Sequence, residues 1–241
     1  MNLALFDLDH TLLPIDTGYQ WARFMVKCGM ADSDQFAREV EQAHVDYNAG
    51  TLDMSAFLRT VLAPLSAHPR AQLNAWRAQF VREVVEPAIR PEALALVRRH
   101  RDHGDLCCLV TATNDFVTAP IADAFGLHGL VASVAETVDG HPESAYTGRP
   151  AGIPSFGAGK IARTEAWLAS LGKRWDDFER SWFYSDSRND IPLLERVTDP
   201  VATNPDATLR AHAQKAGWPI LELFDPDAAI ESQAACPASA D

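Results

Sequence analysis

The chain has 241 residues, of which 47% are hydrophobic and 22% charged, and its formal net charge at pH 7 is −12. No apolar run approaches the ~18 uninterrupted residues of a membrane span, and a strong negative charge without a basic stripe is the opposite of a surface that binds phosphate backbones. We therefore expect neither a membrane nor a nucleic-acid partner, and the length predicts one large domain that carries a smaller insertion.

The N-terminus and the cysteines indicate the compartment. Residues 1–7 contain no basic n-region and reach an acid after four apolar residues, which is unlike a secretory signal, so we expect a cytoplasmic protein. The four cysteines are too few and too scattered for a disulfide framework, and Cys107 and Cys108 are neighbours in an apolar run. We interpret them as buried thiols.

Short apolar runs alternate with helical patterns along the chain, at residues 3–6, 106–110, 182–184 and 219–221. Each run has the length of a strand buried on both faces, and the alternation predicts an α/β fold with a doubly wound, Rossmann-like parallel sheet. Such sheets bind ligands at the carboxyl ends of their strands. Asp7, Thr111 and Asp186 fall at or just past the ends of the first three runs.

Residues 15–86 interrupt this rhythm and predict an all-helical cap inserted after the first strand. Apolar residues recur at three- and four-residue spacing in residues 35–40, 54–65 and 72–85, with turns expected at residues 48–50 and 68–69. We assign residues 1–14 and 87–224 to the core and residues 15–86 to the cap. A hairpin is expected between residues 131 and 146, with its turn at Asp139-Gly140. Residues 225–241 are expected to be a disordered tail.

The segment Asp7-Leu8-Asp9-His10-Thr11 carries the strongest chemical signal. Two carboxylates two residues apart on an extended segment can face the same crevice, so Asp7 could attack phosphorus while Asp9 serves as general acid and base. The alternative is a polar turn that caps a helix. His10 should face away from the two carboxylates, and we give it no catalytic role.

Three further positions follow in order. Thr111 could bind an anion through its hydroxyl and through the backbone N–H groups that follow, or it could be a simple helix cap. Lys160, after Gly157 and Gly159, could reach a phosphate, although a single lysine is normally a solvated surface group. Asp186 and Asp190 offer the hard oxygen ligands that suit Mg²⁺, with helix capping as the alternative.

Together these segments resemble the haloacid dehalogenase superfamily over residues 2–223. The family pattern of Asp-x-Asp-x-Thr, a Thr after a strand, a Lys and two Asp residues four apart is met in order. The helical insertion resembles the first-position cap of the phosphoserine-phosphatase-like branch. Residues 185–194, Asn204-Pro205 and Gly217-Trp218-Pro219 resemble bacterial members of that branch, which include histidinol-phosphatase-like proteins.

The resemblance implies a set of roles for these residues. Mg²⁺ would be held by carboxylates of Asp7 and Asp186 and by the backbone carbonyl of Asp9, and Thr111, Ala112 and Lys160 would bind the phosphate. Asp190 would orient waters or Lys160, and Asn189 would contact the phosphate side. An acid at the position of Asp9 is typical of phosphatases and phosphotransferases, because an alkoxide needs a proton to leave and a halide does not.

The cap positions bear on the substrate. In phosphoserine phosphatases a Glu after the first motif binds the substrate amine and a cap Arg binds its carboxylate. Here these positions fall on Asp16 and Thr60, with Arg59 beside the latter as a tentative substrate contact. We therefore predict a small phosphate monoester that bears an amine, such as histidinol phosphate. Phosphoserine and a phosphotransferase reaction remain alternatives, a receiver domain is the alternative of another class, and the oligomeric state is not predicted.

Overall fold

A seven-stranded sheet with strand order β4-β3-β2-β1-β5-β6-β7 forms the centre of the computed structural model, which describes residues 1–31 and 33–224. All neighbouring strands are parallel except β3 and β4, which are antiparallel. The predicted α/β fold with a doubly wound sheet is confirmed. The predicted tail at 225–241, including Cys236, lies outside the described residues. The strands are β1 (Leu3–Phe6), β2 (Leu106–Asn114), β3 (Gly129–Thr137), β4 (Tyr146–Ala151), β5 (Ser181–Ser185), β6 (Asp199–Thr203) and β7 (Ile220–Leu221).

The central strand β1 is buried on both faces. Leu3 and Leu5 belong to one hydrophobic cluster, and Ala4 and Phe6 belong to another on the opposite face. The same alternation divides Cys107 from Cys108 in β2, and both thiols are buried, as predicted. A fully apolar strand between two cores leaves its carboxyl end, where Asp7 follows, as the first place for a polar side chain.

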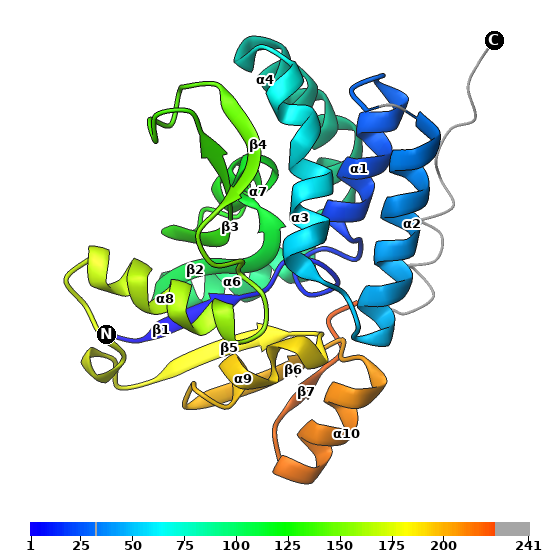
Figure 1. The fold of residues 1–241 in the computed structure, drawn as a ribbon. Coiled ribbons are helices and arrows are strands. Elements are labelled where there is room, and N and C mark those ends of the chain that lie inside the picture. Colours follow the sequence, from blue (N-terminus) through cyan, green and yellow to red (C-terminus); the bar gives the residue numbers. More distant parts are fainter. Residues whose placement is uncertain (32, 225–241) are drawn as a thin grey trace.

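The described part of the chain between β1 and Pro91, where α6 (Pro91–Asp102) begins, consists of helices and their connections, which form the cap (Figure 1). They pack into the cluster that contains Phe6, through side chains such as Trp21, Met25 and Phe80. A helical insertion after the first strand is thus confirmed, while its boundaries at 15 and 86 stay a prediction. The elements are α1 (Thr17–Lys27), α2 (Ser33–Ala49), α3 (Met54–Leu62), the 3₁₀ helix η1 (Ala63–Ala67), α4 (Arg70–Phe80), the π-helical segment η2 (Val81–Val85) and α5 (Glu86–Ala88).

The antiparallel hairpin of β3 and β4 reaches from the sheet to the cap. Its loop is longer than the predicted turn at Asp139-Gly140. The N–H of Val138 donates to the carbonyl of Ala145 across the base of the loop, at 3.0 Å, so six residues lie between the two paired positions. Figure 1 shows β4 beside α3, and β4 contacts both α3 and η1. Gly148, with φ of +80°, lies where a Cβ would come within 2.9 Å of the Ser66 hydroxyl. Contact this close requires glycine and joins the cap to the sheet.

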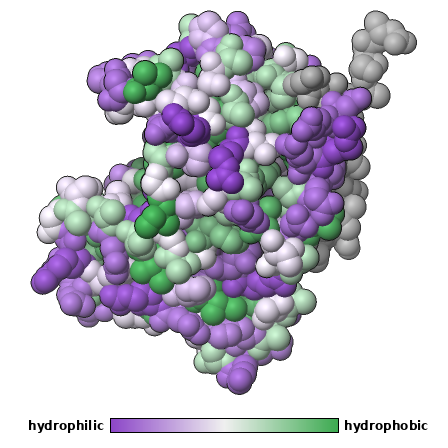
Figure 2. Space-filling view, in the orientation of Figure 1, coloured by the Kyte–Doolittle hydropathy of each residue, from purple (hydrophilic) through white to green (hydrophobic). Residues whose placement is uncertain are grey.

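The remaining helices cover the two faces of the sheet. No helix in the described ranges is long and apolar enough to cross a membrane. Figure 2 shows hydrophilic and hydrophobic residues interspersed over the face drawn there. These helices are α6 (Pro91–Asp102), α7 (Asp115–Ala124), α8 (Ala158–Ser170), α9 (Ile191–Leu194) and α10 (Ala207–Ala216), with 3₁₀ turns η3 (Trp175–Asp177) and η4 (Arg188–Asp190).

A buried polar cluster lies beside the first strand. His100 of α6 is 2.8 Å from Asp105 through Nδ1 and 2.8 Å from the Tyr184 hydroxyl through Nε2, and the Tyr184 ring stacks on Phe6 at 5.2 Å. Burial is the main influence on the pKa of His100 and lowers it, so the neutral ring donates to Asp105 and accepts from Tyr184. The backbone carbonyl of Tyr184 accepts from the N–H of Asp7 at 2.9 Å, which fixes the start of the site.

Candidate active site

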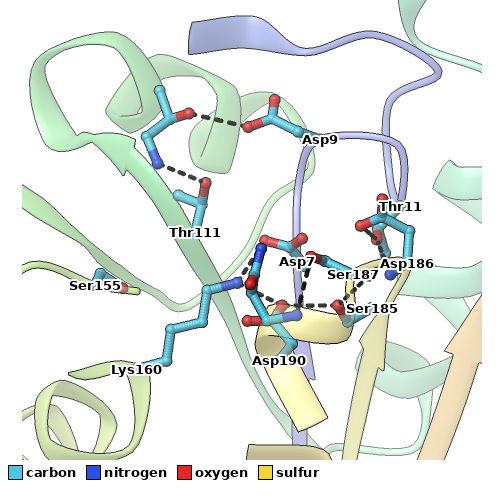
Figure 3. A network of polar contacts seen from close by, with 12 residues as sticks. Asp7, Asp9, Thr11, Thr111, Ser155, Lys160, Ser185, Asp186, Ser187 and Asp190 are labelled. Atoms are coloured by element: carbon cyan, nitrogen blue, oxygen red, sulfur yellow. Dashed lines mark hydrogen bonds and ion pairs between the residues drawn. The ribbon is translucent and has the colours of Figure 1, made fainter. Parts of the chain in front are cut away.

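The carboxyl end of the sheet gathers the polar side chains predicted from the sequence (Figure 3). Asp7 follows β1, Thr111 lies in β2, and Asp186 follows β5. Lys160 comes from α8 and Asp190 from η4. Segments far apart in the chain therefore meet at one crevice, as the parallel topology requires.

Lys160 joins two carboxylates inside the protein. Its side chain is 3% exposed, and its Nζ donates to Asp7 at 3.0 Å and to Asp190 at 2.6 Å. The hydroxyl of Ser185 also donates to Asp190, at 2.7 Å. Burial alone would lower the pKa of Lys160, but the charges of Asp190 and Asp7 outweigh it and raise the pKa. The lysine is therefore a fixed cation and not the solvated surface group of the alternative interpretation.

Asp7 lies at the end of β1 with its carboxyl group almost enclosed. Removal from water is the largest influence on its pKa and raises it to about 7; Lys160 lowers it, and the carboxylates of Asp190 and Asp9 raise it. A nucleophile must be deprotonated, so additional positive charge near Asp7 would favour the reactive form.

Asp186 is held by Thr11 of the first motif. The Thr11 hydroxyl donates to the Asp186 carboxylate at 3.2 Å and accepts from the Asp186 N–H at 3.0 Å. Burial and repulsion from Asp7 and Asp190 raise the pKa of Asp186 well above its usual value. Two carboxylates that repel each other in a crevice are stabilised by a cation between them. The donor set therefore fits a divalent metal.

The side chains alone do not make a complete metal site. Within residues 1–31 and 33–224 there is no group of three or more His, Cys, Asp or Glu side chains arranged to hold an ion. Mg²⁺ nevertheless suits this crevice, because it keeps several waters and is usually bound through one or two carboxylates together with substrate phosphate. Asp7 and Asp186, with the backbone carbonyl of Asp9, match that preference.

Asp9 is oriented by threonines from the cap and from β2. Its Oδ1 accepts from the N–H of Thr17 at 2.7 Å and from the Thr17 hydroxyl at 2.5 Å, and its Oδ2 accepts from the Thr113 hydroxyl at 2.9 Å. Removal from water raises the pKa of Asp9 to about 6, with a further contribution from Asp16. A carboxyl group with a pKa near neutrality can both donate and accept a proton at physiological pH.

The structure corrects the expected position of Thr111. The strand does not end there but continues to Asn114, whose side chain caps α7 by accepting from the N–H of Val117 at 3.2 Å. Thr111 is therefore neither the cap of a helix nor at its N-terminus. Its buried hydroxyl accepts from the N–H of Thr113 at 3.1 Å, and Ala112 lines the crevice.

A cavity beneath the cap continues from the catalytic carboxylates. Asp9 and Asp186 line it on the core side, and Asp16 and His44 line it on the cap side. Asp16 is also the N-cap of α1, since its Oδ1 accepts from the N–H of Tyr19 at 2.8 Å. Its Oδ2 is 3.9 Å from Nδ1 of His44, which is beyond hydrogen-bond reach. The remaining wall is largely apolar and aromatic: Trp21, Val40, Leu52, Met54, Phe57, Leu58 and Val61.

Two expectations for this region are wrong. Arg59 is exposed and lies outside the cavity lining, because the face of α3 that lines the cavity carries Phe57, Leu58 and Val61. His10, expected to face away, lines the cavity. The alternation used for His10 does not apply, because the chain leaves the extended conformation after Asp7 and His10 has a φ of +55°.

Several residues that shape the site were not identified from the sequence. Thr17, Thr113, Ser185 and Ser187 bond to the catalytic side chains or to the loop that carries them. Only Thr113 had a usable signal, because it lies two residues beyond Thr111 on the same face of a strand. Asn189, predicted to contact the phosphate, is half-buried beside Asp190, and its N–H donates to the Ser187 hydroxyl at 3.2 Å.

The geometry agrees with a comparison against known families. A family model for haloacid dehalogenase-like hydrolases matches residues 4–195. The chain belongs to this family. The predicted superfamily is confirmed.

Curated relatives locate the chain within the family. A histidinol-phosphatase of Neisseria meningitidis is 38% identical over 92% of this chain and 99% of its own length. A phosphoserine phosphatase of Mycobacterium tuberculosis is 33% identical over 91% of this chain and 70% of its own length. The predicted phosphoserine-phosphatase-like branch, and with it the prediction of a phosphatase, is confirmed.

Solved structures agree on the fold. A protein of unknown function from Bordetella pertussis Tohama I is 49% identical, with a TM-score of 0.86 over 92% of this chain and 99% of that one. A substrate-bound phosphoserine phosphatase is 18% identical, with a TM-score of 0.62 over 95% of this chain and 97% of that one, and it supports the fold alone. Membership of this family removes the receiver-domain alternative.

Proposed function

We propose that this chain is a Mg²⁺-dependent phosphatase that hydrolyses a small phosphate monoester bearing an amine and no carboxylate, with histidinol phosphate as the leading candidate. The observation that carries the substrate class is the lining of the cap cavity. Among the residues that the structure describes, this lining contains the carboxylate of Asp16 and no Arg or Lys. A substrate ammonium group finds an anionic partner there, while a substrate carboxylate finds no cation.

In the proposed reaction Asp7 is the nucleophile. An oxygen of its carboxylate attacks phosphorus while the bond to the leaving oxygen breaks, and Asp9 gives its proton to that oxygen. Water then attacks the phosphorus of the aspartyl-phosphate, Asp9 takes a proton from the water, and the bond to Asp7 breaks to release phosphate. Both carboxyl groups return to their starting states.

The negative charge of the phosphate is balanced in this proposal by cations on two sides. Mg²⁺, when bound by Asp7, Asp186 and the carbonyl of Asp9, would neutralise charge on the phosphoryl oxygens. Lys160, held by Asp190 and Ser185, lies against Asp7. Thr111 and Ala112 would bind the phosphate from β2. The protein as a whole repels anions, so these local cations are needed for binding.

Asp16 has one oxygen available for the substrate. Its Oδ1 caps α1, whereas Oδ2 accepts no hydrogen bond from the described residues and lies 3.9 Å from Nδ1 of His44. A substrate ammonium group could therefore bond to Oδ2 without disturbing the helix. The apolar wall beyond it would receive the rest of the leaving group.

The specificity constants for histidinol phosphate, phosphoserine and an aryl phosphate test the substrate class. Both substrates carry an ammonium group for Asp16, but the carboxylate of phosphoserine would enter the cavity without a cation to pair with. We therefore expect histidinol phosphate to exceed phosphoserine by roughly ten- to hundredfold, the cost of leaving one charged group without its hydrogen-bond partner. Asp16→Asn keeps the helix cap but removes the charge, so it should lower the specificity constant for histidinol phosphate and leave that for the aryl phosphate unaffected.

Arg59→Ala is the matched control, because it removes a cap charge outside the cavity. It should change none of the three specificity constants. Phosphoserine as the best substrate, lost in Arg59→Ala, would show that Arg59 binds a carboxylate after all. Transfer of the phosphoryl group to an added alcohol faster than to water would favour a phosphotransferase. The cytoplasmic location expected from the sequence stays a prediction.

A further inference from the structure

Tyr47 of the cap contacts the loop that carries Asp186 and Asp190. It lies near the C-terminal end of α2, and its hydroxyl is 3.2 Å from the hydroxyl of Ser187. Its ring packs against Phe156, with ring centroids 6.2 Å apart. Three residues further along the chain, Gly50 has a φ of +75° and lies against the guanidinium of Arg188, where a Cβ would clash. The end of α2 is thus seated directly on residues 185–190.

Ser187 begins a chain of hydrogen bonds that ends at the nucleophile (Figure 3). Its N–H donates to the Ser185 hydroxyl at 3.2 Å, and the Ser185 hydroxyl donates to Asp190 at 2.7 Å. Asp190 accepts from Lys160 at 2.6 Å, and Lys160 donates to Asp7 at 3.0 Å. We call Ser187, Ser185, Asp190 and Lys160 the loop chain. All four of these residues are buried.

Buried hydrogen bonds of this kind leave little freedom to their members. Each polar group in the loop chain has its partner inside the protein, and a displaced group would lose that partner without gaining water. The Ser187 hydroxyl also accepts from the N–H of Asn189 at 3.2 Å, so Ser187 holds the start of η4 on which Asp190 lies. A contact on Ser187 therefore acts on the orientation of Asp190 and of the lysine it holds.

We propose that Tyr47 is a positioning residue that links the seating of the cap on the core to the alignment of Lys160 and Asp7, through Ser187 and the loop chain. The proposal rests on the proposed function for its effect on rate, but not for the contact itself. Because the tyrosine hydroxyl comes from the cap and the serine from the core, the bond forms only when the cap is seated. Tyr47 also lines the cavity beneath the cap. A positioning role lowers phosphoryl transfer from every substrate by a similar factor, whereas a direct contact with the leaving group would change KM for one substrate more than for another.

Tyr47→Phe removes the hydroxyl and keeps the ring against Phe156. We expect kcat to fall about 2- to 10-fold, by a similar factor for an aryl phosphate and for an amine-bearing phosphate, with KM changed less than about 2-fold. Hydrogen exchange of the amides in residues 185–190, measured in the protein without substrate, should become about 2- to 10-fold faster.

Tyr146→Phe is the matched control. Tyr146 lies in β4 beneath the guanidinium of Arg70, 4.0 Å from its ring centroid, so it is also a tyrosine at a contact between the cap and the rest of the protein. Within the described residues, Tyr146 forms no hydrogen bond with residues 185–190. Neither kcat nor exchange in that loop should change in Tyr146→Phe.

A double-mutant cycle with Ser187→Ala separates positioning from general loosening of the fold. If Tyr47 acts through Ser187, Tyr47→Phe has no further effect on kcat or loop exchange in the Ser187→Ala background. If the fold-changes in kcat of the two single variants multiply in the double variant, the proposal is overturned. Unchanged kcat and unchanged loop exchange in Tyr47→Phe would also overturn it. If the wild-type protein hydrolyses no phosphate ester but Tyr47→Phe still exchanges faster in this loop, the contact is supported and the proposed function is rejected.

Discussion

Replacing Asp9 with asparagine isolates the proton that this residue is proposed to transfer. The carboxylate accepts from Thr17 through Oδ1 and from Thr113 through Oδ2. An asparagine can keep the bonds from Thr17 through its carbonyl and donate from its amide nitrogen to the Thr113 hydroxyl, which rotates to accept. The fold and the cavity should therefore persist in Asp9→Asn while the titratable proton is lost.

The size of the effect depends on the leaving group. A positioned general acid contributes about 10²- to 10⁴-fold, so hydrolysis of an alkyl phosphate should fall by that factor in Asp9→Asn. A phenolate leaves without a proton more readily, so an aryl phosphate should lose far less. With a pKa of about 6, roughly a tenth of Asp9 is protonated at pH 7. The ratio of wild-type to variant rates on the alkyl ester should therefore grow as the pH falls from 7 toward 6.

Specificity constants for one alkyl and one aryl phosphate, measured with Mg²⁺ across this pH range, provide the assay. Thr113→Val is the control, since it removes one hydrogen bond from Asp9 but leaves the carboxyl group, and its losses should be small and alike on both esters. Equal losses on the two esters in Asp9→Asn, or a wild-type to variant ratio that does not change with pH, would refute the role of acid and base.

Two further predictions concern buried titratable groups. Lys160→Met leaves Asp7 and Asp190 buried without their cation, so we expect the free energy of unfolding to fall by about 3–5 kcal/mol, with partial recovery when Mg²⁺ is added. Urea unfolding with and without the metal measures this free energy, and a variant as stable as the wild type would contradict the prediction. His100 has a lowered pKa, so its contribution to stability is present above the unfolded pKa of about 6.5 and is lost as the pH falls through that value toward the folded pKa. The stability difference between wild type and His100→Asn should therefore shrink between about pH 7.5 and pH 5, and a constant difference across this range would show that His100 does not titrate in this way.

The strands and the catalytic carboxylates were predictable because their signals are local. The run before Asp7 is apolar at every position, and the sheet topology then determines where its carboxyl end lies. β6 was missed because it is short, begins with Asp199 and Pro200, and is only partly buried, so it shows neither an apolar run nor an alternation. The long β3 and β4 hairpin was only partly predicted, because β4 is stabilised by the cap and not by its own pattern.

The partners of the catalytic groups could not be predicted, because they lie far along the chain. Asp9 and Thr113 are 104 residues apart in sequence, and Tyr47 and Ser187 are 140 apart. Neither pair has a spacing that a helix or strand would reveal. The position of Arg59 failed for a related reason: a shift of one residue on a helix turns a side chain by about 100°, and only packing shows which face of α3 lines the cavity.

The aspartyl-phosphate on Asp7 is the central claim, and trapping it is the most direct test. Wild-type protein mixed with an aryl phosphate and Mg²⁺, quenched rapidly in acid and digested, should yield the peptide that contains Asp7 with the added mass of one phosphoryl group. Chelation of the metal and the substitution Asp7→Asn should each remove both this modified peptide and the hydrolysis, while the circular dichroism spectrum of the variant stays that of the wild type. Undiminished hydrolysis in Asp7→Asn or in chelator, or a phosphoryl group found on another residue, would contradict the account.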